Sequence, residues 1–277
     1  MLTGFIGLGN MGRPVARNLI RLGYTVKLFD LYQPSVDKAM EAGNTGVPVK
    51  DVREMADCDL VFTCLPMPDD MDFVTAALST DVGGTLYTAC KRLGVTKDTS
   101  VAIFGVGPMG MGGVIIASAL GAKVIAVDGN PERLASALEN GAQYAVDCTK
   151  ENAVERIREL TGEGCDAAIV CVGAKSAING ALDATRPIGT VGLIGEINES
   201  TFSPSLQMMR KLLTMKGCWY FNRNDWQEIS DFMTGKTTGT PVPIHRIATR
   251  TYRLEEAVEA FELFDSGKVQ KVVFVWD

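Results

Sequence analysis

Glycine and aspartate recur with one spacing at two places in this sequence of 277 residues. Residues 7–12 read Gly-Leu-Gly-Asn-Met-Gly and residues 105–110 read Gly-Val-Gly-Pro-Met-Gly. An aspartate follows each set 18 positions beyond its last glycine, as Asp30 and Asp128. A single pattern of three glycines is a weak signal, but short apolar runs precede both sets and helix-forming runs follow them. The duplication therefore indicates two strand–turn–helix units of one kind.

The spacing suits the binding of a dinucleotide. The first glycine permits a tight turn, the second lets the backbone approach a pyrophosphate, and the third allows close helix–strand packing. The unpaired N–H groups of the helix start favour negative charge. The predicted contacts at the first set come from Gly7, Gly9, Asn10, Met11, Gly12 and Asp30; those at the second come from Gly105, Gly107, Pro108, Met109, Gly110 and Asp128.

The two aspartates indicate which dinucleotide binds. A carboxylate at the end of the second strand accepts hydrogen bonds from the adenine ribose and repels a 2′-phosphate. The next three residues are Leu-Tyr-Gln after Asp30 and Gly-Asn-Pro after Asp128, so no Arg or Lys directly follows either carboxylate. We therefore predict NAD at both sites, with NADP disfavoured.

The pattern of apolar runs and turns predicts an α/β chain with two Rossmann-like, doubly wound parallel-sheet units. The first unit is truncated to four strands in the order 3-2-1-4, and the second has six strands, the last over 214–221. A small α+β lobe closes the chain. We predict a truncated NAD-binding unit over 1–67, a connecting segment over 68–98, a complete NAD-binding domain over 99–222 and a C-terminal lobe over 223–277.

Composition excludes several classes of partner. The net charge is −6, with no basic face, which argues against nucleic acid and anionic membranes. Residues 99–122 carry no charge, but they hold the second glycine set and fit a strand, a turn and a buried helix better than a membrane span. The first strand begins at once, without the basic start of a signal peptide, so we expect a cytoplasmic protein.

The sequence offers no evident metal centre and no assigned catalytic residue. The seven cysteines form no CxxC pair, and the single histidine is His245, so we expect no zinc site. His245 is the one side chain whose ordinary pKa lies near neutrality, but a loop residue is the more economical interpretation. Lys211, before the sixth strand, is expected to be a solvated charge at a helix end.

Residues 4–14, 28–30 and 59–66 closely resemble the 3-hydroxyisobutyrate (β-hydroxyacid) dehydrogenase family. The carrying residues are Gly4-Phe5-Ile6 with the first glycine set, then Leu28-Phe29-Asp30, then Asp59 to Pro66. The resemblance implies that Leu65 and Pro66 end the fourth strand beside the cofactor. It stops near residue 67, and the substrate motif and helical domain of that family have no counterpart here.

From residue 68 onward the chain resembles the second half of a medium-chain, zinc-type alcohol dehydrogenase. The matching stretches are 68–71, 81–87, 105–110, 124–128, 166–173, 189–195 and 266–273. The resemblance implies that Val172, Gly173, Ile194 and Gly195 lie along the nicotinamide and that Lys271 lies near the pyrophosphate. It also implies a homodimer through the sixth strands.

The zinc-binding catalytic domain of that second family has no counterpart here. Residues 76–78 read Ala-Ala-Leu where some relatives place a cysteine ligand. The chain is similar to a fusion in which a second nucleotide-binding half replaced the substrate domain. This implies an NAD-binding oxidoreductase acting on a CH–OH group of a small alcohol or hydroxyacid. The alternatives are a non-catalytic protein that binds or senses NAD, and a structural partner in a larger dehydrogenase assembly.

Overall fold

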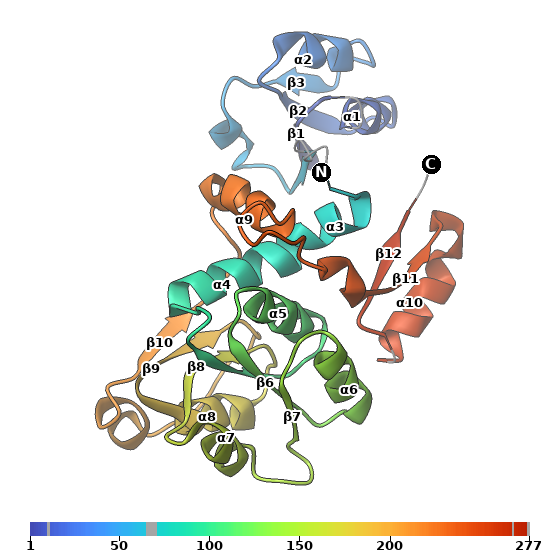
Figure 1. Cartoon of the computed structure of the whole chain (residues 1–277). Helices are drawn as coiled ribbons and strands as arrows, with labels where there is room; N and C mark the ends of the chain where they lie inside the picture. The colour runs from blue at the N-terminus through green and yellow to red at the C-terminus, as the bar shows by residue number, and fades with distance from the viewer. Residues whose placement is uncertain (10–11, 65–70, 268, 276–277) are drawn as a thin grey trace. The chain divides into compact units, whose positions relative to one another are not determined.

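A computed structural model describes residues 1–9, 12–64, 71–267 and 269–275. Its contacts divide the chain into unit 1, Met1–Asp69, and unit 2, Asp70–Asp277 (Figure 1). Within the described ranges, no helix is both long and apolar enough to cross a lipid bilayer.

Unit 1 is a four-stranded parallel sheet with two helices packed on it. The sheet order is β3-β2-β1-β4, as predicted. Its core gathers apolar side chains of the helices and of the two central strands, among them Ile20 and Leu28. The elements are β1 (Leu2–Ile6), α1 (Gly12–Arg21), β2 (Thr25–Phe29), α2 (Gln33–Met40), β3 (Gly46–Pro48), η1 (Val52–Met55) and β4 (Leu60–Thr63).

The crossover from β3 to β4, which lies wholly within the described residues, contains no α-helix. It holds only the 3-10 turn η1, which begins with a capping box. The Asp51 side chain accepts the backbone N–H of Arg53 at 2.8 Å, and Glu54 accepts that of Asp51 at 3.0 Å. These bonds satisfy the local donors within a single turn, so no longer helix is needed.

Unit 2 opens with a helical segment of three parts, α3 (Phe73–Leu78), the π-helical η2 (Ser79–Gly84) and α4 (Thr85–Leu93). A nucleotide-binding type of sheet follows, with parallel strands in the order β10-β9-β8-β5-β6-β7. Its elements are β5 (Ser100–Phe104), α5 (Pro108–Ala119), β6 (Lys123–Asp128), α6 (Pro131–Glu139), β7 (Tyr144–Asp147), α7 (Ala153–Thr161), β8 (Cys165–Val170), α8 (Lys175–Ala184), β9 (Thr185–Leu193), η3 (Pro204–Met209) and β10 (Thr214–Gly217). The predicted fold class, the strand order of unit 1 and the six parallel strands of unit 2 are confirmed.

The strand expected over 214–221 is shorter than predicted. β10 ends at Gly217, and Tyr220 has a φ of 57°, in the left-handed region and not in the extended region of a regular strand. Cys218 continues the ladder by one bond, its N–H donating to the Leu193 carbonyl at 2.8 Å. The chain therefore turns away from the sheet just after Cys218.

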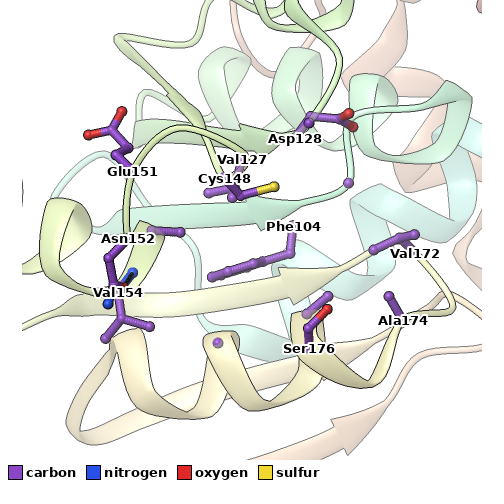
Figure 2. A pocket seen from close by; sticks show the side chains of 15 residues that line it. Phe104, Val127, Asp128, Cys148, Glu151, Asn152, Val154, Val172, Ala174 and Ser176 are labelled. Carbon is purple, nitrogen blue, oxygen red and sulfur yellow. Dashed lines mark hydrogen bonds between the residues drawn. The ribbon is translucent and has the colours of Figure 1, made fainter.

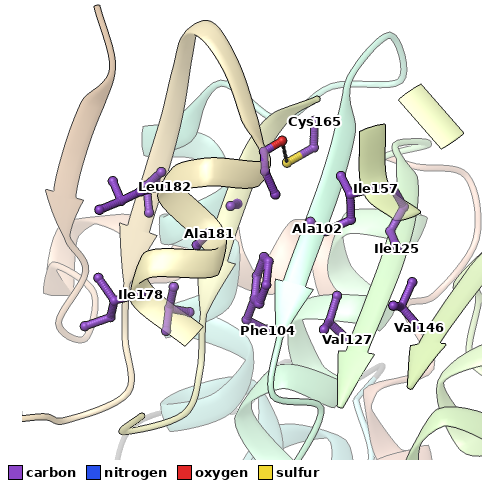
Figure 3. Packing of buried hydrophobic residues seen from close by; sticks show 14 of the residues in the cluster. Ala102, Phe104, Ile125, Val127, Val146, Ile157, Cys165, Ile178, Ala181 and Leu182 are labelled. Atoms are coloured by element: carbon purple, nitrogen blue, oxygen red, sulfur yellow. Dashed lines mark hydrogen bonds between the residues drawn. The ribbon is translucent and has the colours of Figure 1, made fainter. Parts of the chain in front are cut away.

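One hydrophobic core of unit 2 lies between this sheet and the helices α7 and α8 (Figure 3). Alternate residues of the central strands, such as Ala102 and Phe104 of β5, face these helices and are buried. Ile178 and Leu182 of α8 pack against them, one helical turn apart. This packing fixes the position of the carboxyl end of β5, where the glycine-rich turn begins.

The C-terminal region forms the predicted helix–strand–helix–strand lobe. Its elements are η4 (Arg223–Asp225), α9 (Trp226–Met233), η5 (Ile244–Ile247), β11 (Ala248–Tyr252), η6 (Leu254–Glu256), α10 (Ala257–Asp265) and β12 (Lys271–Phe274), with β11 and β12 parallel. Glu228 of α9 holds this region to α4. Its carboxylate accepts the Tyr87 hydroxyl at 2.8 Å and pairs with the Lys91 ammonium at 2.5 Å.

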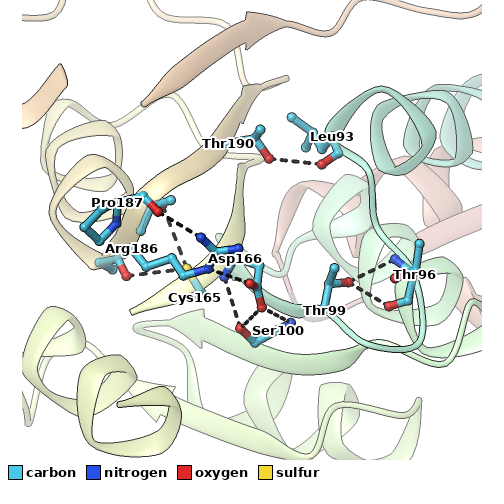
Figure 4. Close-up of polar contacts among 11 residues, drawn as sticks. Leu93, Thr96, Thr99, Ser100, Cys165, Asp166, Arg186, Pro187 and Thr190 are labelled. Carbon is cyan, nitrogen blue, oxygen red and sulfur yellow. Dashed lines mark hydrogen bonds and ion pairs between the residues drawn. The ribbon is translucent and has the colours of Figure 1, made fainter. Parts of the chain in front are cut away.

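A carboxylate ties three strands together at the opposite end of the sheet from the glycine turn (Figure 4). Asp166 of β8 accepts the Ser100 backbone N–H and hydroxyl, each at 2.7 Å, and pairs with Arg186 Nε at 2.6 Å. Partial burial acts to raise the pKa of Asp166, but the bonds from Ser100 and Arg186 outweigh it and hold that pKa below its ordinary value.

We expect Asp166→Asn to lower the free energy of unfolding at pH 7 by about 1–3 kcal/mol, the usual worth of hydrogen bonds to a charged group. Because the folded pKa is the lower one, this stabilisation is present above the unfolded pKa of about 4 and is lost as the pH falls through the folded pKa. The free energies of unfolding of the wild-type protein and of Asp166→Asn, measured by denaturant titration, should therefore converge at acidic pH. The exposed Asp98→Asn is the control, and a pH-independent difference would contradict the assignment.

Candidate dinucleotide site

The first and third glycines close the same turn in both units. Gly7 and Gly105 have φ values of 89° and 83°, which favour glycine. A Cβ on Gly12 would lie 1.9 Å from the Gly7 carbonyl oxygen, and one on Gly110 would lie 1.8 Å from that of Gly105. No side chain fits at either position, so the start of each helix packs directly on the end of its strand.

The middle glycine of each set faces open space instead. A Cβ on Gly9 would meet nothing within 4 Å, and one on Gly107 would have Arg133 Nη1 as its near neighbour, at 3.7 Å. Gly107 is the N-cap of α5, whose first N–H groups have no intrahelical partner. This bare backbone beside a helix start is where a pyrophosphate would bind.

Each predicted ribose carboxylate is held beside its loop by two backbone amides. One amide follows the first glycine, and the other lies two positions after the aspartate. Asp30 accepts Leu8 N at 2.5 Å and Tyr32 N at 2.7 Å; Asp128 accepts Val106 N at 2.8 Å and Asn130 N at 2.9 Å. The two units thus repeat the geometry as well as the spacing, and both carboxylates keep lone pairs for a ribose.

A cleft of about 460 Å³ opens next to Asp128 in unit 2 (Figure 2). Asp128 lies at its rim, and Phe104 lies across its floor between β6 and α8. Cys148 and Val172 line it from the loops after β7 and β8. A largely apolar cleft with a carboxylate at its edge suits a purine ring that is attached to a ribose.

The residues predicted along the nicotinamide come together after β8 and β9. Gly195 N donates to the Val170 carbonyl at 2.9 Å, and a Cβ on Gly195 would lie 2.6 Å from Val172 N. A Cβ on Gly173 would lie 2.3 Å from the Glu196 carbonyl oxygen. The loop after β8 and the loop after β9, which begins with Ile194, form one close-packed wall beyond the glycine turn.

Two side chains near the second glycine turn were not predicted from the sequence. Arg133, in the first turn of α6, lies near Gly107, although it does not directly follow Asp128. Gln270 donates from Nε2 to the Val106 carbonyl at 3.3 Å, while its buried Oε1 has no partner among the described residues. Lys271 follows it as the first, half-buried residue of β12. A basic residue five positions after the aspartate was the available signal for Arg133.

The remaining predicted residues fall into two groups. Pro108 and Met109 are the first two residues of α5, as the turn requires. Asn10, Met11, Leu65 and Pro66 lie outside the described residues.

The two candidate bases lie elsewhere. His245 is exposed in η5, close enough to Asp72 to help lower the pKa of that carboxylate. Lys211 is not the solvated charge that was expected, because Nζ donates to the Leu182 and Asp183 carbonyls at 2.5 and 3.2 Å. Burial lowers the pKa of Lys211, which caps α8.

The described residues do not fit a zinc ion. Among them, no three His, Cys, Asp or Glu side chains gather closely enough to bind a metal. Burial raises the pKa of Cys165 to about 11 and that of Cys90 to about 12, which keeps these thiols protonated. No catalytic step through zinc can be derived from this part of the chain.

Two family models match the chain in succession. Residues 3–86 match the NAD binding domain of 6-phosphogluconate dehydrogenase, and residues 108–235 match the zinc-binding dehydrogenase family. The chain therefore joins two dehydrogenase-type nucleotide-binding units.

Individual relatives agree with the second match. Human sorbitol dehydrogenase is 32% identical over 218 residues, which are 77% of this chain and 59% of that protein. The structure of alcohol dehydrogenase TADH from Thermus sp. ATN1 matches with a TM-score of 0.69 at 30% identity, over 77% of this chain and 61% of that one. The structure of 2R,3R-butanediol dehydrogenase from Bacillus subtilis matches with a TM-score of 0.69 at 25% identity, over 77% of this chain and 60% of that one. Unit 2 is therefore similar to part of these alcohol and polyol dehydrogenases. The chain spans about three fifths of the length of these relatives.

We expect Gly107→Val to fold normally and to weaken NAD binding at least about tenfold, because its side chain would occupy the open space over the turn. The backbone of Gly107, with φ −65° and ψ −166°, is open to other residues. Gly110→Ala is the structural contrast, since its Cβ would meet the Gly105 carbonyl and lower the melting temperature. Calorimetric NAD titration and thermal melting of both variants separate the two roles.

The matched change in unit 1, Gly9→Val, should weaken NAD binding less. Equal losses from Gly9→Val and Gly107→Val would refute the ranking of the two sites.

Proposed function

We propose that unit 2 binds NAD across the carboxyl ends of its strands. The pyrophosphate lies over Gly107 at the start of α5, the adenine ribose lies on Asp128, and the adenine lies in the adjoining cleft. One observation carries the proposal: Gly107 is open, whereas the Val172 side chain closes the space at Gly105 and the Gly105 carbonyl closes that at Gly110. Arg133 adds a positive charge next to that opening.

We further propose that any catalytic activity of the chain is that of an oxidoreductase acting on a CH–OH group. Bound NAD would accept the hydride. The chain's own residues hold the dinucleotide. The wall formed by the loops after β8 and β9, where Val172 and Gly195 meet, is the Val172–Gly195 wall, and it limits the water that reaches the nicotinamide end of the dinucleotide. The support is the relation to polyol and alcohol dehydrogenases named above. The alternative is a protein that binds or senses NAD without turnover, because neither His245, in η5, nor Lys211, which caps α8, belongs to that wall.

Three finer proposals rest on resemblance. The consecutive matches, residues 3–86 and 108–235, support a fusion in which a nucleotide-binding unit stands in place of a zinc-binding catalytic domain. A homodimer would pair β10, the outer strand of the six-stranded sheet, with that of a second copy. A cytoplasmic location fits the reduced cysteines of the described residues.

NAD should bind at least about tenfold more tightly than NADP, because the Asp128 carboxylate repels a 2′-phosphate. Asp128→Asn should narrow that ratio, since the neutral amide no longer repels the 2′-phosphate. Titration of both dinucleotides measures the effect, and Asp30→Asn in unit 1 is the matched control. NAD should also slow the alkylation of Cys148, which lines the cleft. Equal affinities in the wild-type chain would show that Asp128 does not contact the ribose.

The protein purified without chelators should contain no stoichiometric zinc and should oxidise simple alcohols slowly or not at all at saturating NAD. Zinc polarises the substrate oxygen and needs about three protein ligands, which the described residues do not supply. Metal analysis and an alcohol and hydroxyacid turnover screen test both statements. About one zinc per chain together with zinc-dependent turnover would reveal a ligand set that has been overlooked.

A further inference from the structure

Unit 1 repeats the adenosine half of the unit 2 site but lacks the wall beyond it. In unit 2, β8 lies between β5 and β9, and the loops after β8 and β9 form the close-packed wall. In unit 1, the corresponding strand β4 pairs with β1 and is the outer strand of its sheet. Its Leu60, Val61 and Phe62 are 43%, 39% and 36% exposed. Within the described part of this unit, no strand provides a second wall.

The groups that hold adenosine diphosphate are nevertheless present in unit 1. The Gly7 turn and the open space at Gly9 reproduce those at Gly105 and Gly107. Asp30 is held by the same two amides as its counterpart. The ribose and pyrophosphate positions are thus both formed.

The residues after Asp30 add a surface that unit 2 lacks. In unit 2 the N-cap of α6 is Asn130, whose side chain accepts Glu132 N at 2.8 Å and Arg133 N at 3.2 Å. In unit 1 the N-cap of α2 is Tyr32, whose side chain makes no capping bond. Tyr32 is 67% exposed and Leu31 is 88% exposed. Helix α2 therefore lacks a favourable side-chain cap, and the large side chains of Leu31 and Tyr32 face solvent beside the ribose carboxylate.

We propose that unit 1 is a second nucleotide site, one that takes the adenosine diphosphate group and does not recognise the nicotinamide. Leu31 and Tyr32 supply the face against which the purine ring packs. Unit 1 has the buried Ser35 five positions after its aspartate, where unit 2 has Arg133, so the positive charge that Arg133 brings to the unit 2 turn is missing at this position. The site is therefore weaker than that of unit 2. It extends the proposed function to the other unit without depending on it.

The test uses the full chain carrying Gly107→Val, which closes the unit 2 site. NAD, NADH and ADP-ribose should bind this variant with dissociation constants within about threefold of one another, because the nicotinamide adds no contact. Adding Gly9→Val should abolish the binding of all three. If NAD bound more than about tenfold more tightly than ADP-ribose, or if ADP-ribose did not bind, the proposal would be overturned.

Three changes at one position test the purine surface in the same background. Tyr32→Ala should weaken ADP-ribose binding about tenfold, the usual size of a base–aromatic contact, whereas Tyr32→Phe should retain it. Tyr32→Asn should weaken binding and yet raise the melting temperature, since it restores a helix cap. A purely structural role for Tyr32 predicts the opposite, with affinity unchanged. The single variant Gly9→Val, which leaves unit 2 intact, shows separately whether unit 2 binds NAD.

Discussion

The contact between a helix start and the carbonyl of the first glycine is the constraint on which both nucleotide turns depend. At 1.8–1.9 Å from an ideal Cβ, this carbonyl admits hydrogen alone, at Gly12 and again at Gly110. The contact orients the helix so that its N-terminus points to the space over the middle glycine. It also brings the amide of Leu8 or Val106 to the aspartate at the end of the second strand. One backbone contact thus positions both the phosphate site and the ribose carboxylate.

The two units differ in what surrounds this shared turn. Unit 2 adds Arg133, an apolar cleft and the wall formed after β8 and β9. Unit 1 has an outer strand, an uncapped helix and two exposed apolar side chains in the corresponding region. Because the turn is fixed by backbone geometry, it survives such changes, and selectivity for a ligand depends on the neighbouring loops.

Sequence reasoning reached the fold because the constraints on it are local. Apolar runs of five or six residues set the strands, and glycines that no other residue can replace set the turns. It failed where the outcome depends on tertiary placement. The positive φ of Tyr220 ends β10 early, and the direction of α6 brings Arg133 to Gly107. Lys211 reaches two carbonyls of α8 that lie nearly thirty positions away in the chain.

The difference between local constraints and tertiary placement also explains why the binding site can be predicted from the sequence while the catalytic residues cannot. A glycine turn leaves a spacing in the sequence, whereas an acid or base need only lie near the nicotinamide, from any element. In the described part of unit 2, burial keeps Cys90 and Cys165 protonated, and Lys211 is occupied by carbonyls. His245 is exposed in η5. A proton carrier therefore has to be sought in what borders the Val172–Gly195 wall, because the glycine turn itself contributes only backbone.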